Sequence, residues 1–221
     1  MMKIPRIFHQ IWLGRQPMPV EFLAWQKTWT SLNPSWTLKL WTEDNLPDSR
    51  WPDLVKRSHG YSQMSNIYRY EILLREGGVY VDTDCECSKP IEPLISDCEA
   101  FVVRTKRPYV KIGCGTIGGV VGHPLFHKLV ERLNLVDPSK KLSMGSSYMT
   151  EIVAGHLNTM NRPDVKVIPS ALMNPYDCTE LKDGRPLPKE NFPDAYILHH
   201  WSSRWHPTGF AALPTRIATK S

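Results

Sequence analysis

The sequence predicts an α/β domain, because segments with the pattern of strands alternate with segments with the pattern of helices. In the first kind, apolar residues alternate with polar ones, and in the second they recur with a period near 3.6. The chain has 221 residues, 41% hydrophobic and 22% charged, enough for one well-buried core and too few for two ordinary ones. We therefore expect a single domain over residues 1–221.

The first half of the chain contains the clearest elements. We expect a strand from Arg6 to Trp12, a helix from Val20 to Leu32 that follows a proline pair, and a second strand from Trp36 to Thr42. A proline-rich, irregular stretch from Glu43 to Gly60 separates these elements from a helix predicted from Ser62 to Glu76.

The second half continues the alternation with shorter elements. Pro124 suits the first position of a helix. We expect a loop from Lys106 to Cys114, helices over Pro124 to Asn134 and Lys140 to Leu157, and strands over Ala100 to Arg104, Thr116 to Val121, Val165 to Ile168 and Ala195 to His199.

The most informative segment runs from Gly77 to Asp84 and reads Gly-Gly-Val-Tyr-Val-Asp-Thr-Asp. The glycine pair ends the preceding helix, and the apolar run predicts a buried strand. The run ends in two acids, and strand alternation places Asp82 and Asp84 on one face, with carboxylate stems roughly 6 to 7 Å apart along the strand. Two such carboxylates suit Mg²⁺ or Mn²⁺. Water molecules and substrate phosphates usually complete the coordination shell of these ions. Ligands of open α/β sheets bind beyond the carboxyl ends of strands, where these acids lie.

The preceding helix presents Asn66, Arg69 and Tyr70 on one side, at positions i, i+3 and i+4. An arginine close to the two carboxylates would suit sugar hydroxyls or phosphate oxygens. The alternative is an ordinary surface arginine that pairs with a nearby glutamate.

The five cysteines do not form a pattern typical of zinc fingers. Cys85 and Cys87 follow the acids directly, but strand alternation would place them on the face opposite Asp82, Asp84 and Glu86. We expect reduced, buried thiols. His123 and His127 lack a third metal ligand, and we interpret them as ordinary residues at a helix start.

The net charge of +5 and the eight tryptophans do not indicate nucleic-acid binding, because the basic residues are dispersed and most tryptophans fall at core or pocket positions. The excess positive charge suits an anionic donor or an acceptor at an anionic membrane surface. Residues Met1 to Trp12 lack a continuous apolar run, and no stretch of the sequence approaches a membrane span. We expect a cytoplasmic protein, soluble or peripherally bound to a membrane.

Several motifs together resemble one family. They are Ile4 to Gly14, Ser65 to Tyr70, Gly77 to Asp84, Gly122-His123-Pro124, Met144-Gly145-Ser146, Val167-Ile168-Pro169, Asn174-Pro175-Tyr176 and His199-His200-Trp201 with Trp205. Their order is similar to that of the DXD-containing sugar-transferase family typified by the fungal initiating α-1,6-mannosyltransferase, with relatives in bacterial capsule and lipopolysaccharide synthesis. The resemblance covers most of the chain.

The resemblance implies a GT-A fold, a single nucleotide-binding Rossmann-like domain with a central mixed sheet flanked by helices. It implies that Asp84 binds the metal directly, that Asp82 contacts the ribose or the metal, and that His199 or His200 adds a metal or diphosphate contact. Because neighbouring strand residues face opposite sides, we favour His199. Further roles follow from the resemblance: the nucleotide pocket is lined by His9, Gln10 and Trp12, the donor sugar is held by Arg69 and Tyr80, and the phosphates are capped by Trp205.

Two departures from the family pattern concern the donor sugar. Asn66 stands where the family usually has an aspartate that binds sugar hydroxyls, and an amide keeps hydrogen-bonding capacity without the charge. Cys114 to Gly119 replaces a segment that commonly carries an asparagine facing the donor. We expect more room near the sugar there.

The resulting expectation is a metal-dependent, retaining hexosyltransferase that uses Mn²⁺ or Mg²⁺. It would move a hexose from a UDP- or GDP-linked donor to a hydroxyl of a glycan, glycolipid or other acceptor. The alternative is a catalytically weakened sugar-nucleotide or glycan-binding protein of the same fold, in which Asn66 marks the loss of activity. A sugar nucleotidyltransferase would need a glycine-rich phosphate loop followed by a lysine, which Phe8 to Gln16 does not contain.

Overall fold

The computed structural model describes residues 3–106, 112–139, 144–159, 164–181 and 185–202. In this part of the chain a six-stranded sheet has the order β2-β1-β3-β6-β5-β7. β6 runs antiparallel to both of its neighbours, and the other neighbouring pairs are parallel. The strands are β1 (Ile7–Ile11), β2 (Thr37–Trp41), β3 (Gly78–Val81), β5 (Ala100–Arg104), β6 (Ile112–Gly119) and β7 (Val165–Ile168). The sheet is therefore mixed, as expected.

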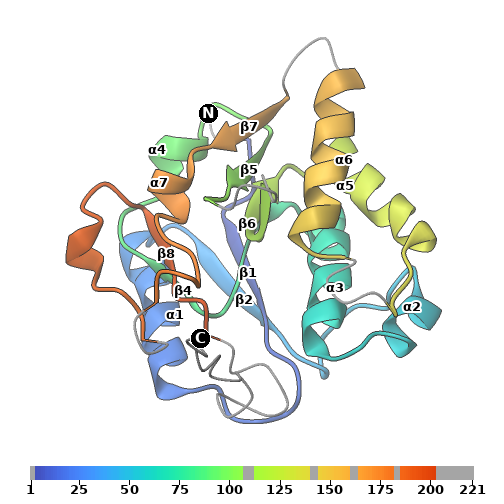
Figure 1. Cartoon of the computed structure of the whole chain (residues 1–221), viewed down its shortest axis with the longest axis horizontal. Helices are drawn as coiled ribbons and strands as arrows, with labels where there is room; N and C mark the ends of the chain where they lie inside the picture. Colours follow the sequence, from blue (N-terminus) through green and yellow to red (C-terminus); the bar gives the residue numbers. More distant parts are fainter. Residues whose placement is uncertain (1–2, 107–111, 140–143, 160–163, 182–184, 203–221) are drawn as a thin grey trace, which may run out of the picture.

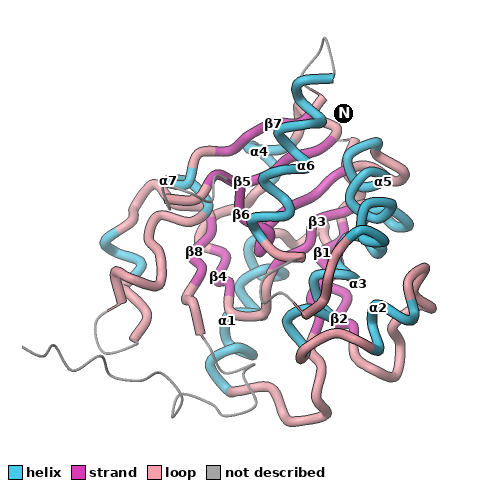
Figure 2. Tube along the Cα trace, turned by 45° about the vertical axis from the view of Figure 1, so that its right-hand side comes forward, coloured by secondary structure: helices cyan, strands magenta, loops and turns pink. Residues whose placement is uncertain are grey.

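Helices cover both faces of this sheet (Figure 1). One face carries α3 (Tyr61–Glu76), α5 (Pro124–Glu131) and α6 (Ser146–Thr159), with α2 (Pro52–Lys56) against α3 and the 3-10 helix η1 (Arg132–Leu135) after α5. The other face carries α1 (Val20–Leu32), α4 (Glu92–Ile95) and α7 (Ser170–Met173). A second, two-stranded sheet of β4 (Cys85–Cys87) and β8 (Ile197–His199) lies beside α1, and a 3-10 helix η2 (Lys189–Asn191) precedes β8 (Figure 2).

The turn between α3 and β3 requires its two glycines. Gly77 and Gly78 have φ angles of 63° and 87°, a region that residues with a Cβ rarely adopt. A Cβ on Gly78 would also lie 2.6 Å from the carbonyl oxygen of Ile7. Gly77 N–H donates to the carbonyl of Leu73 and closes the helix. The glycine pair therefore lets β3 start in hydrogen-bonding register beside β1.

The expected elements are confirmed in position, and the differences lie at their ends. The helix over Val20–Leu32 has the expected bounds. β6 begins at Ile112, inside the segment expected to be a loop. The irregular stretch after β2 contains the helix α2, and β3 ends at Val81, before both acids. The expected start of the helix at Lys140 lies outside the described residues, and its described part begins at Ser146.

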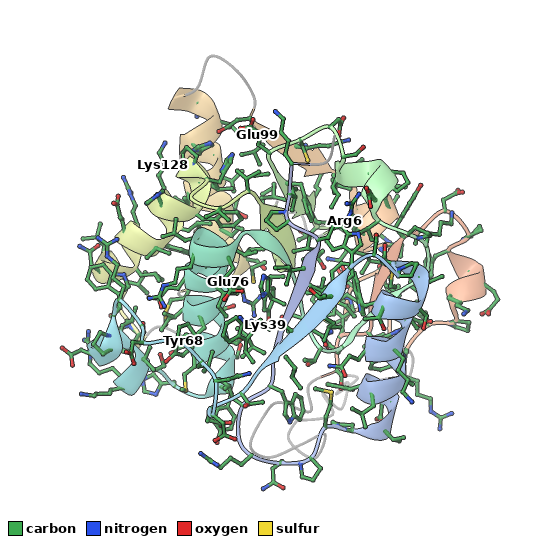
Figure 3. The ribbon with its side chains drawn as sticks, turned by 180° about the vertical axis from the view of Figure 1, so that it is seen from behind. Arg6, Lys39, Tyr68, Glu76, Glu99 and Lys128 are labelled. Carbon is green, nitrogen blue, oxygen red and sulfur yellow. The ribbon has the colours of Figure 1, made fainter. Side chains whose placement is uncertain are left out.

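An ion pair joins the edge strand to the end of α3 at the back of the molecule. Lys39 of β2 and Glu76 of α3 lie side by side there, with 2.8 Å between Nζ and Oε1 (Figure 3). Both side chains are partly exposed, so the pair contributes at most about 1 kcal/mol. Among the described residues, none of the helices combines the length and the apolar character that crossing a bilayer demands.

Candidate functional site

The two acids lie in a turn that connects the two sheets. β3 ends at Val81, and the N–H of Cys85 donates to the carbonyl of Asp82 over 3.0 Å. The expectation that one continuous strand places Asp82 and Asp84 on a single face, with Cys85 on the other, is therefore wrong. The two acids still converge, because the turn directs both toward His199 at the end of β8, with 3.1 Å from His199 Nε2 to Asp84 and 4.0 Å to Asp82.

Asp84 is buried and carries several contacts to the strand that ends at His199. Its Oδ2 accepts from the N–H of Ser202 over 2.8 Å, and its carbonyl accepts from the N–H of His200. Burial opposes the charged carboxylate, but His199 and the Ser202 N–H outweigh it and lower the pKa of Asp84. Burial also opposes the charged imidazole, yet Asp84 and then Asp82 raise the pKa of His199. The two groups form a charged pair at the floor of the site.

Two donor groups, the hydroxyl of Tyr80 and the guanidinium of Arg69, hold Asp82 through one carboxylate oxygen. Its Oδ1 accepts from the hydroxyl of Tyr80 over 2.8 Å and lies 3.1 Å from Arg69 Nη2. The guanidinium also lies 4.3 Å from the centre of the Tyr80 ring. Its other oxygen, Oδ2, faces His199 and the backbone of Gly115, where a Cβ would come within 2.5 Å of it. Gly115 therefore makes the room that the carboxylate of Asp82 occupies.

Arg69 contacts the carboxylate of Asp82 and also the backbone of β6. Its Nη1 donates to the carbonyl of Cys114 over 2.6 Å, and its Nη2 donates to Ser65 Oγ over 3.0 Å. The side chain is 4% exposed, and although burial opposes the cation, Asp82 raises the pKa of Arg69. The expectation that Arg69 lies close to the acids is confirmed, and its described contacts go to the protein.

Asn66 lies next to Cys114, the residue at the second departure from the family pattern. The thiol of Cys114 is 3.7 Å from Asn66 Oδ1 and 3.5 Å from Ser146 Oγ. This group of three neutral polar side chains joins α3, β6 and α6 beside Asp82. The extra room expected at residues 114–119 is taken in part by the Asp82 carboxylate at Gly115.

The residues expected to line a nucleotide pocket have different surroundings. His9 is fully buried: its Nε2 is 2.9 Å from the carbonyl of Gly77, and Trp41 Nε1 donates to its Nδ1. Burial lowers the pKa of His9 to about 4. His9 therefore connects β1, β2 and the glycine turn in the interior, contrary to the expected position at a pocket wall.

Gln10 and Trp12 lie on and after β1, toward α1. Gln10 is buried, and its Oε1 accepts from Gln26 Nε2, whereas its own Nε2 has no hydrogen-bond partner. Trp12 is partly exposed and donates to the carbonyl of Gln16. An unpaired buried donor at this strand end is compatible with the expected role of Gln10 in binding a ligand.

His200 belongs to a separate network. Its Nε2 lies 3.1 Å from Glu86 Oε2, its Nδ1 lies 3.0 Å from the hydroxyl of Tyr176, and its ring stacks on Trp25. The structure therefore does not bring His200 to the two acids, whereas His199 lies beside both. Trp205, expected to cap the phosphates, lies outside the described residues.

A second group of imidazoles and a carboxylate lies at the other end of the sheet. Asp164, just before β7, is 3.3 Å from His123 Nε2 and 2.9 Å from His156 Nε2. His123 Nδ1 accepts from the N–H of Leu125 and caps α5. Sequence reasoning missed this group, because His156 and Asp164 carry no local motif and meet His123 only through the packing of α5 and α6.

One group of side chains in the described part of the chain has the spacing of a metal site. Ligand atoms of Asp84, Cys85 and His199 all lie within 4.8 Å of one another. Carboxylate oxygen and imidazole nitrogen are suitable ligands for Mn²⁺. Asp84 and His199 therefore fit a divalent ion, with the free oxygen of Asp82 close by.

Several known proteins are similar to this chain. Residues 19–101 match the family model described as the glycosyltransferase sugar-binding region containing DXD motif. The chain is 26% identical, over 94% of its length, to inositol phosphoceramide mannosyltransferase 1 of Schizosaccharomyces pombe, and it spans 64% of that protein. It is 25% identical, over 92% of its length, to the uncharacterised glycosyltransferase L373 of Acanthamoeba polyphaga mimivirus, and it spans 84% of that protein. It is 23% identical, over 58% of its length, to the initiation-specific α-1,6-mannosyltransferase of Candida albicans, and it spans 42% of that protein.

Solved structures show the same fold at low sequence identity. The PaToxG glycosyltransferase matches with a TM-score of 0.56 and 16% identity over 72% of each chain. The galactosyltransferase LgtC, solved with donor and acceptor sugar analogues, matches with a TM-score of 0.52 and 11% identity over 93% of this chain and 92% of its own. Residues 19–101 therefore resemble the glycosyltransferase sugar-binding region that contains the DXD motif, and the fold of the chain is that of the GT-A glycosyltransferases.

Proposed function

We propose that this protein is a metal-dependent, retaining hexosyltransferase that uses a UDP- or GDP-linked sugar as donor. The observation that carries the proposal is the convergence of Asp82 and Asp84, just after β3, with His199, the last residue of β8. Ligands of open α/β sheets bind at such strand ends, and two carboxylates with an imidazole are typical of a site for a divalent ion and a phosphate-bearing ligand.

Asp84 and His199 would hold the ion, with Asp82 Oδ2 on the same side. A bound Mn²⁺ or Mg²⁺ would neutralise charge on the departing diphosphate, which is worth several kcal/mol in the transition state. The ion pair between His199 and Asp84 keeps both side chains oriented toward the position proposed for the ion. The Ser202 N–H holds the second oxygen of Asp84 and so fixes the rotation of the carboxylate.

Arg69 and Tyr80 position Asp82 in this proposal. Their donors occupy Oδ1, which leaves Oδ2 for the ribose or the metal. Asn66, Cys114 and Ser146 form the neutral wall beside Asp82 and would contact the hydroxyls of the donor sugar. Because an amide both donates and accepts, Asn66 can still bind a sugar hydroxyl.

Retention at the anomeric carbon is proposed to proceed on one face of the donor. Glu86, the next carboxylate along the chain, contacts His200 at 3.1 Å and Lys189 at 3.8 Å, so it is already engaged away from the two acids. We propose that an oxygen of the departing phosphate accepts the proton of the acceptor hydroxyl. A covalent glycosyl-enzyme isolated from a trapped reaction would contradict this route.

The donor and acceptor classes come from the relatives. Relatives named as mannosyltransferases favour GDP-mannose as the first donor to test, with UDP-hexoses next. One of them is named for inositol phosphoceramide, which favours a glycolipid hydroxyl as acceptor, with glycan hydroxyls as the second class. The net charge of +5 suits an acceptor at an anionic surface.

The test is release of nucleoside diphosphate from a panel of nucleotide sugars, with and without Mn²⁺. We expect one donor to be hydrolysed slowly in a Mn²⁺-dependent reaction, and the Asp84→Asn variant to lose this activity. Donor binding without turnover, in the presence of Mn²⁺ and of candidate acceptors, would favour the alternative of a catalytically weakened binding protein. Restored turnover in Asn66→Asp would then identify Asn66 as the cause.

A further inference from the structure

We infer that Asn174 binds the acceptor, and that its side-chain oxygen accepts a hydrogen bond from a hydroxyl of a polyhydroxylated ring, either a sugar or a cyclitol. The inference rests on the proposed function for the positions of the ion and of the donor sugar. It goes beyond that function by naming an acceptor-binding residue and the part of the acceptor that it holds.

The first observation is that the side chain of Asn174 is buried with an unpaired oxygen. Asn174 follows the short helix α7, and its backbone N–H donates to the carbonyl of Ser170 over 2.7 Å. The residue is 4% exposed, and within the described part of the chain its Oδ1 has no hydrogen-bond donor. A buried oxygen without a partner is destabilising, so its presence in a folded protein needs an explanation. A ligand hydroxyl would supply the missing donor.

The second observation is that Asn174 lies on the face of β6 that also meets the candidate metal ligands. A Cβ built on Gly113 would lie 3.7 Å from Asn174 Nδ2. One built on Gly115 would lie 3.3 Å from a ring carbon of His199 and 2.5 Å from Asp82 Oδ2. Residues two apart in a strand point to the same face, about 7 Å from each other. The amide is therefore a neighbour of the proposed ion position along one strand face.

The wall proposed for the donor sugar lies on the opposite face of the same strand. Cys114, between the two glycines, contacts Asn66 of α3 and Ser146 of α6. Asn174 comes from the other side, where α7 packs against β5 and β8 (Figure 1). With the donor sugar against Cys114, the position beside Asn174 remains for a second ring.

The loop that carries Asn174 is fixed to the segment around His199. The hydroxyl of Tyr176 lies 3.0 Å from His200 Nδ1, and the carbonyl of Tyr176 accepts from Trp201 Nε1 over 2.9 Å. The ring of Trp201 stacks on that of His199, with 4.1 Å between the centroids. A continuous series of contacts therefore sets the position of Asn174 relative to the candidate metal ligand.

The proposed reaction on one face of the donor places the acceptor on this side. The acceptor oxygen forms a bond to the anomeric carbon as its O–H bond breaks. The bond from that carbon to the diphosphate breaks, and a diphosphate oxygen takes the electron pair and the proton. The acceptor must therefore approach beside the ion. An amide oxygen accepts hydrogen bonds without taking a proton, so Asn174 would hold a neighbouring hydroxyl of the ring and orient the reacting one.

The experiment measures ring binding by saturation-transfer NMR in the presence of Mg²⁺ and GDP or UDP. The two probes are methyl α-mannoside, a sugar ring, and myo-inositol, a cyclitol ring, and the one that binds identifies the kind of acceptor. We expect the affinity for that ring to fall by about tenfold in Asn174→Ala, because one hydrogen bond in a buried site is lost. In the transfer reaction, the KM for the acceptor should rise more than the KM for the donor.

The matched control is Asn33, another buried amide, at the end of α1. It is 3% exposed, its Nδ2 donates to the carbonyl of Trp29 over 2.8 Å, and its Oδ1 accepts from the N–H of Ile91 over 3.0 Å. Asn33→Ala breaks these hydrogen bonds, so its midpoint of thermal unfolding should fall further than that of Asn174→Ala. Its affinity for the ring should equal that of wild type.

The outcomes separate this inference from the proposed function. No binding of either ring by wild type, equal affinity in wild type and Asn174→Ala, or an equal loss in Asn33→Ala would overturn the inference. None of these results bears on the Mn²⁺-dependent release of nucleoside diphosphate, which tests the proposed function. Ring binding that depends on Asn174, in a protein that releases no nucleoside diphosphate, would support the binding site and contradict the transferase. Asn174→Leu, which fills the same volume, replaces Asn174→Ala if the latter does not fold.

Discussion

Two groups of histidine and aspartate lie at opposite ends of the sheet and have different consequences for the molecule. One joins His199 to Asp84 and Asp82 at the turn after β3. The other joins His123 and His156 to Asp164 before β7. Residue types and distances are similar, but the first group lies beyond strand ends next to Arg69, and the second connects helices α5 and α6 to the sheet.

The ionisation of the histidines follows this difference. At the turn, the two aspartates raise the pKa of His199 against the effect of burial. In the second group, burial prevails over Asp164 and lowers the pKa of His123, whose Nδ1 already accepts a hydrogen bond from the start of α5. The comparison teaches that the same residue types can form a candidate site or a purely structural contact. Which of the two they form depends on whether they lie at strand ends or between packed helices and the sheet.

The largest effect is expected for Asp84→Asn. This change keeps the shape of the side chain and removes the charge that pairs with His199. We expect transferase activity to fall by about 100-fold or more, since several kcal/mol of transition-state stabilisation are at stake. Initial rates with the donor found in the panel check this, with circular dichroism as the test of folding. Activity within a factor of a few of wild type would contradict the assignment.

The Asp164→Ala change should reduce stability and leave activity unchanged, whereas Asp84→Asn should reduce activity. Asp164→Ala removes the carboxylate that accepts a hydrogen bond from His156 and lies 3.3 Å from His123 Nε2, so we expect a loss of about 1 to 3 kcal/mol in the free energy of unfolding and unchanged transferase activity. Urea denaturation checks it. The matched control is Asp97→Ala, because Asp97 forms an exposed pair with Lys166 and should contribute much less to stability. Equal losses in the two variants would remove the distinction between the buried contact and the surface pair.

Gly115→Ala tests whether the position of Asp82 matters. The new Cβ would come within 2.5 Å of Asp82 Oδ2, and the flexible carboxylate must move to avoid it. We expect stability to change little, and activity to fall by about tenfold, which corresponds to about 1.4 kcal/mol. Gly155→Ala is the control, because nothing lies within 4 Å of its Cβ and the helix α6 should tolerate or favour alanine. Full activity of Gly115→Ala would show that the placement of Asp82 is not critical.

A prediction about pH dependence concerns His9. Burial lowers the pKa of His9 from its ordinary 6.5 to about 4, so the unfolded chain binds a proton in this interval that the folded protein does not. The folded state therefore loses stability as pH falls from 6.5 to 4, by at most about 1.4 kcal/mol per pH unit for this group. We expect His9→Gln to lose part of the slope of unfolding free energy against pH. A slope identical to that of the control His127→Gln, which removes an exposed imidazole, would contradict this account.

Local patterns in the sequence predicted the framework of the fold. The period of apolar residues fixed α1 at Val20–Leu32, and the glycine pair marked the change from α3 to β3. These signals are local, because helix ends and tight turns depend on neighbouring residues. The convergence of the acids with His199 followed from their places at strand ends and from the resemblance to a family.

Features that depend on distant residues could not be predicted in this way. The alternation argument failed at Asp82 to Asp84, because the strand stops and the chain turns to pair β4 with β8. His9 was expected at a pocket wall, but Trp41 and the carbonyl of Gly77 occupy both of its ring nitrogens. Burial and register are tertiary properties, and a single sequence does not contain them in a readable form.

The most direct test of the account is a titration of the protein with Mn²⁺, followed by electron paramagnetic resonance of the free ion. The account predicts one tightly bound Mn²⁺ per chain in the wild-type protein and in Asp164→Ala, and a large loss of this binding in Asp84→Asn. Equal binding of Mn²⁺ by wild type and Asp84→Asn would contradict the claim that the turn at Asp82 to Asp84 and His199 form the metal site.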